Sequence, residues 1–199
     1  MNKLDEKIIS MRNQQKNQNV DIEKGVYIDH SLTEFVEVEA FDGQITLLIP
    51  SNFKDLPTEH AKIKYPSESR PQFIKTPPDD TSVNLCLSLI DCPITEQSLA
   101  DDAREMKNLL KKTNPALEFY KSNIEQLEDF KLAWFEFKSF AIDGQMFNIM
   151  FVAPAHGQML QGVFNCFFDK IETWQKPALE MIKSLKYTKK EAETVSQIK

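Results

Sequence analysis

The sequence predicts an α+β fold, in which helices pack on an antiparallel sheet. Tight-turn dipeptides join apolar runs at residues 42–43, 143–144 and 156–157, and such turns connect antiparallel neighbours. Residues 95–114 and 171–185 have apolar residues at helical spacing, which indicates two amphipathic helices. The order of elements is a strand pair, a helix, a strand meander and a closing helix, and this order favours a sheet-and-helix sandwich over alternating parallel units.

We expect one folded domain with a polar segment at each end. The chain has 199 residues, enough for one sizeable core, and no linker divides it. Residues 1–30 are polar and rich in Gln, Asn and Lys, which predicts a loosely attached, partly disordered N-terminal arm. Residues 188–199 have few apolar side chains, which predicts a solvated tail. The domain should therefore span residues 31–187.

The first half of this domain has the pattern of short strands separated by turns. Asp42-Gly43 lies between two apolar runs. Because both turn residues must tolerate positive φ, this pair is the strongest short-range signal of a β-hairpin. A short helical turn is expected after Thr58, before Pro66. The expected strands are residues 34–40, 44–49, 71–76 and 83–90.

Two longer helices are expected to cover the sheet. The helix at residues 95–114 has Thr95 as its N-cap candidate, acidic residues in its first turn and lysines in its last turn, which suits the helix dipole. The helix at residues 171–185 carries an apolar stripe that must be laid on a sheet. We therefore expect Trp174 and Leu185 to be buried.

A strand meander is expected between the helices. If residues 143–144 and 156–157 each form a two-residue loop, Met150 lies opposite Phe137 on one side and opposite Val163 on the other. The expected strands are residues 117–127, 131–142, 145–153 and 158–166.

Because side chains alternate along a strand, the meander has two faces of different composition. The conventional core face contains Trp134, Phe140, Phe147, Ile149, Phe151, Leu160, Phe164 and Cys166. The other face contains Phe135, Phe137, Ser139, Met146, Asn148, Met150, Val152, Met159, Gln161, Val163 and Asn165. A sealed core favours Leu, Ile and Val, and a solvated face favours Lys, Glu and Thr, so this second face has neither composition.

The second face is the candidate functional site, and two interpretations stay open. Helices could cover it, with Asn148 opposite Asn165 in an internal amide ladder. Alternatively, part of it stays open and receives an apolar helix or segment of another protein, because Met repacks around different apolar groups and amides satisfy polar ones. The residues predicted to line this groove are Met146, Asn148, Met150, Gln161 and Asn165.

Composition argues against nucleic acid and membrane partners. The net charge is −6 at pH 7 with a pI of about 5.2, which disfavours binding to phosphate backbones and anionic bilayers. No apolar run is long enough to span a bilayer, and the N-terminus lacks a signal-peptide pattern. The three cysteines form no CxxC motif, which is typical of a reducing compartment. We therefore expect a cytoplasmic protein of the bacterial type.

No catalytic or metal-binding motif is present. The five glycines form no phosphate-cradling loop and no nucleophile elbow, and no His or Cys pair has ligand spacing. Glu136 and Lys138 share a strand face and are expected to pair with each other at a sheet edge. We expect a non-enzymatic binding or adaptor protein without cofactor or metal.

The alternative is an enzyme with a dispersed site, for example a cysteine that meets a histidine in space. The oligomeric state is open, a dimer included.

Two short motifs resemble the PsbP/Mog-type family. A strand runs into IPSNF at residues 49–53, similar to the family's Pro-x-x-aromatic turn, and the closing helix ends in MIKSLK at residues 181–186. The resemblance covers about residues 34–187, and the polar arm and the acidic N-terminal half depart from it. It implies an α/β/α sandwich and a binding role. Relatives by fold include Eag-type chaperones, which shelter apolar segments of secreted effectors.

Overall fold

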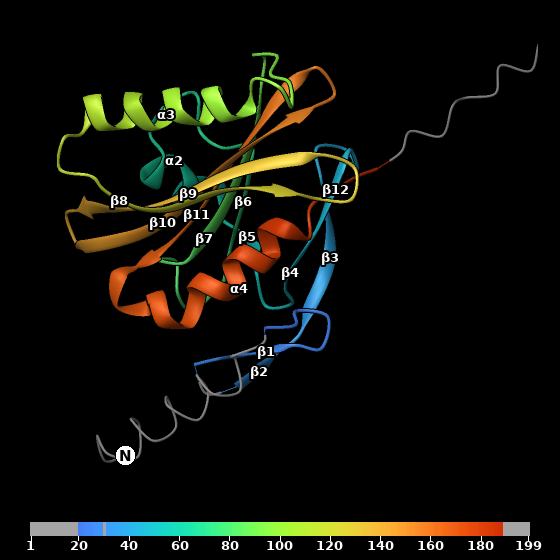
Figure 1. Cartoon of the computed structure of the whole chain (residues 1–199). Coiled ribbons are helices and arrows are strands. Elements are labelled where there is room, and N and C mark those ends of the chain that lie inside the picture. The colour runs from blue at the N-terminus through green and yellow to red at the C-terminus, as the bar shows by residue number, and fades with distance from the viewer. Residues whose placement is uncertain (1–19, 30, 189–199) are drawn as a thin grey trace, which may run out of the picture.

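The main sheet has seven strands in the order β5-β6-β7-β11-β10-β9-β8, and every neighbouring pair is antiparallel. A computed structural model describes residues 20–29 and 31–188 and shows helices on both sides of this sheet (Figure 1). The predicted α+β class is confirmed. The strands are β5 (Lys54–Asp55), β6 (Phe73–Thr76), β7 (Asn84–Ile90), β8 (Glu118–Gln126), β9 (Lys131–Ala141), β10 (Gly144–Ala155) and β11 (Gln158–Phe167).

The sheet is the middle of three layers. Helices α2 (Thr58–Lys64) and α3 (Leu99–Thr113) pack on one face. Helix α4 (Ile171–Lys183), preceded by a short 3-10 turn η1 (Phe168–Lys170), packs on the other (Figure 1). Within the described ranges, no helix is long and apolar enough to cross a membrane.

A small three-stranded sheet completes the layer that contains α4. Its strands are β3 (Phe35–Ala40), β4 (Ile45–Pro50) and β12 (Lys186–Tyr187), in the order β12-β4-β3. Asp42 and Gly43 have φ values of 55° and 75°, and the Gln44 N–H donates to the Phe41 carbonyl at 3.1 Å. The predicted Asp-Gly hairpin is therefore confirmed.

Part of the predicted N-terminal arm belongs to the core. Strand β1 (Val26–Ile28) pairs with β2 (Ser31–Thr33), and Ile22, Val26 and Ile28 are buried in the main apolar cluster. This differs from a loosely attached arm, because three apolar residues within a polar stretch are enough to anchor it. The rest of the predicted arm, residues 1–19 and 30, and residues 189–199 of the predicted tail lie outside the described residues.

Helix α3 begins later than predicted. The Ser98 N–H donates to the Thr95 hydroxyl oxygen at 3.1 Å, and the Thr95 N–H donates to the Ser98 hydroxyl oxygen at 3.0 Å. These reciprocal bonds hold residues 95–98 in a turn of their own, so the helix starts at Leu99. The burial predicted for Trp174 and Leu185 is confirmed, with exposed fractions of 4% and 2%.

The second hairpin of the meander is predicted correctly, and the first is displaced. His156 and Gly157 have φ values of 49° and 82°, and Met150 lies opposite Val163. In the first hairpin, residues 142–143 form the turn, so Met150 lies opposite Phe135 rather than Phe137.

This displacement of the register by two residues leaves every side chain on its predicted face. Phe140 is nevertheless 48% exposed, contrary to the prediction of a core position. Residues 140–145 are all exposed at the hairpin tip, where no layer covers them.

Candidate functional site

The middle strand of the main sheet is sealed on one face and only partly covered on the other, where Met159 and Val163 pack against the clusters beneath α3. On the α4 side of β11, Leu160, Phe164 and Cys166 are all 0% exposed. The alternate residues point to the side of the sheet that carries α2 and α3, here called the α3 face, and all four are partly exposed. These four residues, here called the β11 strip, are Met159, Gln161, Val163 and Asn165.

The β11 strip lies between the parts of the α3 face that the helices cover. Helix α3 contacts β9 and β10, with Met106 packed on Ala133 and Val152. Helix α2 lies beyond β11, where Ala61 belongs to a small cluster with Cys86 of β7. The chain's own helices therefore flank the middle strand without sealing it.

The structure separates the five predicted groove residues into two groups. Met146, Gln161 and Asn165 are partly exposed. Asn148 and Met150 are each only 7% exposed. Met150 packs in a cluster that includes residues of α3, so the exposure expected there is not found. The three exposed residues are accessible to a partner, and the two buried ones belong to the floor of the α3 face. Partner binding by any of them stays a prediction.

The amides of this face do not form the ladder that sequence reasoning considered. Asn148 and Asn165 are opposite each other, but the Asn148 side-chain amide donates to the Phe137 carbonyl and the Ser139 hydroxyl, at 3.2 and 2.9 Å. The Asn165 side-chain carbonyl accepts from the Asn84 amide at 3.0 Å. Each amide is thus bound to a different neighbouring strand.

The two buried cysteines, Cys86 and Cys166, do not have the setting of a catalytic nucleophile. Burial raises the pKa of Cys86 to about 11, and the 3.2 Å contact with the Tyr65 hydroxyl reverses this only in part. Burial likewise raises the pKa of Cys166 to about 12. A reactive cysteine needs a lowered pKa. Cys92 is exposed.

The other candidate polar groups are accounted for by structural contacts. Glu136 is buried and accepts a hydrogen bond from the Gln175 amide at 2.7 Å, and Lys138 forms an ion pair with Glu118 at 2.7 Å. The predicted pairing of Glu136 with Lys138 is therefore replaced by contacts to neighbouring elements. Over the described ranges, no three His, Cys, Asp or Glu side chains are grouped as metal ligands would be.

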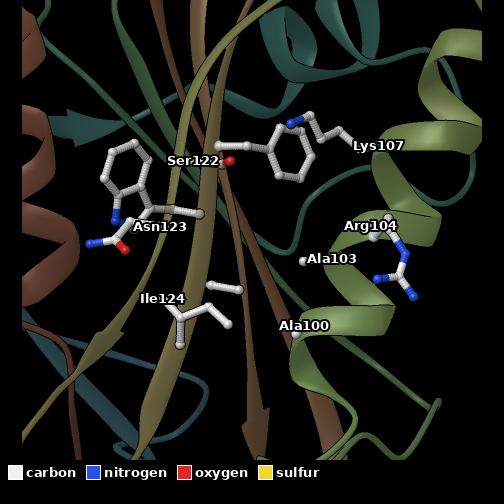
Figure 2. Close-up of a pocket in the computed structure, with 10 residues that line it drawn as sticks. Ala100, Ala103, Arg104, Lys107, Ser122, Asn123 and Ile124 are labelled. Carbon is white, nitrogen blue, oxygen red and sulfur yellow. The ribbon is translucent and has the colours of Figure 1, made fainter.

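Sequence reasoning missed a second opening on the α3 face, on the opposite side of α3 from the β11 strip. Here α3 and the β8–β9 edge of the sheet enclose a cleft of about 530 Å³, here called the α3–β8 cleft (Figure 2). Ala100 and Ala103 form part of its helical wall, and their small side chains leave space beside β8. Its lining is Ala100, Ala103, Arg104, Lys107, Ser122, Asn123, Ile124, Ala133, Trp134 and Phe135.

Comparison with solved structures identifies proteins of the same fold at low sequence identity. The cyanobacterial PsbP protein of Synechocystis sp. PCC 6803 superposes with a TM-score of 0.57 at 9% identity, covering 82% of this chain and 98% of that one. LpqN of Mycobacterium tuberculosis superposes with a TM-score of 0.52 at 16% identity, covering 82% of this chain and 95% of LpqN. The Ran-binding protein Mog1p of Saccharomyces cerevisiae superposes with a TM-score of 0.50 at 10% identity, covering 78% of this chain and 96% of Mog1p.

No family model and no curated protein sequence matches the chain, so the likeness lies in the three-dimensional structure. It confirms the resemblance drawn from the two short motifs. The chain has the PsbP/Mog-like fold.

Proposed function

We propose that this protein is a non-enzymatic binding protein that shelters an apolar segment of another protein on its α3 face, in the manner of a chaperone or adaptor. The observation that carries the proposal is the β11 strip. A strand in the middle of a seven-stranded sheet is fully covered on one side and only partly covered on the other. An apolar surface that the chain's own helices leave incompletely covered is a candidate docking surface.

The chemistry of the strip suits an apolar helix with polar ends. Met159 and Val163 offer apolar contacts, and thioether side chains adapt to differently shaped partners. Gln161 and Asn165 alternate with them along β11. The Gln161 amide offers hydrogen bonds to polar groups of the incoming segment, whereas the Asn165 side-chain carbonyl is already bound to Asn84. The net charge of −6 favours a segment flanked by basic residues.

Two further observations are consistent with this role. Mog1p, which has the same fold, is described as a Ran-binding protein, so this fold is compatible with binding to another protein. Cys86, Cys92 and Cys166 are free thiols, which suits the cytoplasm as the place of action.

The test uses a synthetic apolar helical peptide flanked by lysines as the probe, with binding followed by fluorescence anisotropy. Gln161→Lys places a charge in the middle of the strip at a partly exposed position. We expect this variant to keep its folding stability and to bind the peptide at least about tenfold more weakly, a loss of about 1.4 kcal/mol.

Lys54→Glu is the matched control, because Lys54 is exposed on the short edge strand β5, away from the strip. It should bind the probe like the parent protein. A photo-cross-linker at position 161 should also form an adduct with the peptide, while the same group at position 54 should not. Equal binding by the parent and by Gln161→Lys would refute the proposal.

A further inference from the structure

We propose that the outer edge of β8 and the adjoining α3–β8 cleft bind an extended acidic segment of a partner protein, which adds a strand to the main sheet. This surface is distinct from the β11 strip. The sheet order places β10 and β9, which carry α3, between the two. The proposal therefore concerns a second site and does not rest on the function proposed above.

Strand β8 offers an edge that can be extended. It is the last strand of the seven-stranded sheet, so its outer backbone groups face no further strand in the described part of the chain. Its pairing with β9 is irregular between Phe119 and Ser122 and regular from Ser122 to Gln126. A regular run with free outer N–H and C=O groups is a template for strand addition.

The cleft adjoins this regular run. Ser122 and Ile124 lie opposite Phe135 and Ala133, and all four line the cleft. Figure 2 shows Ser122 and Ile124 on the strand side, facing the helix that carries Arg104 and Lys107. Ile124 is 43% exposed. A strand added beside β8 would therefore direct every second side chain towards the cleft.

The charges of the cleft select an acidic segment. Arg104 and Lys107 are the two charged residues of its lining. The Lys107 ammonium lies 5.4 Å from the ring centroid of Phe119 and 6.0 Å from that of Phe135. No carboxylate of the described residues lies within ion-pair distance of it.

Arg104 pairs with Asp101 at 2.6 Å, but both side chains are about two-thirds exposed, and such pairs contribute little. Lys107, which has no carboxylate partner among the described residues, and Arg104, which has only an exposed one, place cationic groups beside the open edge. An acidic segment would complement them.

The opposite face of β8 restricts where the acidic residues can lie. The side chains of Asn123 and Glu125 alternate with those of Ser122 and Ile124, and on this other face the Glu125 carboxylate accepts hydrogen bonds from the Asn123 amide and the Trp134 indole N–H. The Lys183 ammonium lies 3.9 Å from the Glu125 carboxylate, so the nearby cation on this face already has a carboxylate partner, and a second carboxylate beside Glu125 would be repelled. The preferred segment therefore has acidic residues at every second position, on the cleft side, with uncharged residues between them.

The probe is a peptide of alternating glutamate and valine, about as long as one strand, and binding is measured by isothermal titration calorimetry. We expect it to bind, and a peptide of the same composition with its glutamates consecutive to bind at least about tenfold more weakly, because only alternation matches the strand period. The alternating lysine and valine peptide should not bind. Equal binding of the two glutamate peptides would overturn the proposal.

Lys107→Glu tests the charge of the cleft. It should weaken binding of the alternating peptide at least about tenfold. Lys112→Glu is the matched control, since Lys112 is exposed on the same helix and does not line the cleft, and it should bind normally. Gln161→Lys should also bind the alternating peptide normally. A failure of this proposal can therefore be distinguished from a failure of the proposed function. Normal binding by Lys107→Glu would overturn the assignment of the cleft.

A pair of proline variants tests strand addition itself. Adjacent residues of an antiparallel strand direct their N–H groups to opposite sides, so one of Asn123 and Ile124 has its N–H on the free edge. Of Asn123→Pro and Ile124→Pro, the one at the free edge should fold and lose binding, and the other should lose stability. Retained binding in the folded variant would overturn strand addition. So would a dimer of the parent protein that this variant converts to a monomer, because a second copy would then occupy the edge.

Discussion

At Gly162, the main sheet has no room for a side chain. Gly162 lies opposite Phe151 on the neighbouring strand, and the ring of Phe151 fills the space above it. A Cβ atom on Gly162 would lie 2.0 Å from the ring Cζ atom of Phe151, well inside van der Waals contact. Phe151 is 0% exposed, and a close-packed interior leaves its ring little freedom to move away.

We expect Gly162→Ala to destabilise the protein by about 1–3 kcal/mol, the typical penalty for overpacking a core. Urea unfolding would measure this as a lower midpoint. The double variant Gly162→Ala/Phe151→Leu is the control, because a smaller side chain at position 151 makes room for the methyl group. It should be less destabilised than the sum of the two single variants. Strict additivity would mean that the clash is relieved elsewhere.

At the scale of elements, Ser184 attaches the end of α4 to the small sheet. Its hydroxyl oxygen accepts a hydrogen bond from the Leu48 N–H at 2.9 Å, and the hydroxyl donates to the Met181 carbonyl at 2.7 Å. Leu185 follows directly and is 2% exposed. The helix terminus, the turn after it and β4 are therefore packed as one unit.

We expect Leu185→Asp to destabilise the protein by several kcal/mol, because the carboxylate would be buried without a partner. Lys186→Asp is the control at the adjacent, exposed position and should stay within about 0.5 kcal/mol of the parent. Thermal and urea unfolding would give both values. An unchanged stability of Leu185→Asp would contradict the docking of this segment.

The elements that the sequence predicts well are those with a local signal. Asp42-Gly43 and His156-Gly157 adopt the positive φ values that define their hairpins. In the remaining hairpin, Gly144 follows the turn with a φ of 150° and belongs to β10. The Asp143-Gly144 dipeptide predicts that a hairpin forms here but does not fix its strand register, because a glycine also suits the position just after a turn.

The site is less predictable than the strands. Alternation places Met150 and Gln161 on one face correctly, since the strand period is local. Which of them is covered depends on where α3 lies across the sheet, and this is set by long-range packing of its apolar stripe. The α3–β8 cleft also depends on this long-range packing, because Ala100 and Ala103 create space only once α3 has docked next to Ser122.

At the scale of the whole molecule, the core contains several cysteine and tyrosine side chains that ionise only at a higher pH than usual. Burial raises the pKa of Cys86 to about 11 and that of Cys166 to about 12, and it also raises the pKa values of Tyr65 and Tyr187. In the unfolded chain, cysteine and tyrosine ionise at about pH 8.5 and 10. The unfolded state therefore releases protons first as the pH rises, so alkaline conditions favour unfolding.

We expect the free energy of unfolding to be independent of these groups below about pH 8.5 and to fall as the pH rises towards about 11 to 12. The slope should not exceed about 1.4 kcal/mol per pH unit for each group. Urea unfolding over a pH series would measure it. The double variant Cys86→Ala/Cys166→Ala should show a shallower slope than the parent protein. An unchanged slope in the double variant would contradict the assignment.

The pairing of β12 with β4 has a consequence for synthesis on the ribosome. Tyr187 lies opposite Ile45, its hydroxyl donates to the Pro154 carbonyl, and its ring stacks on Phe130 at 4.0 Å. The hairpin of β3 and β4 leaves the exit tunnel early, but its second edge has no partner until residues 186–187 emerge. The outer edge of β4 therefore stays unpaired until residues 186–187 are synthesised, and an unpaired strand edge in a nascent chain is a template for aggregation.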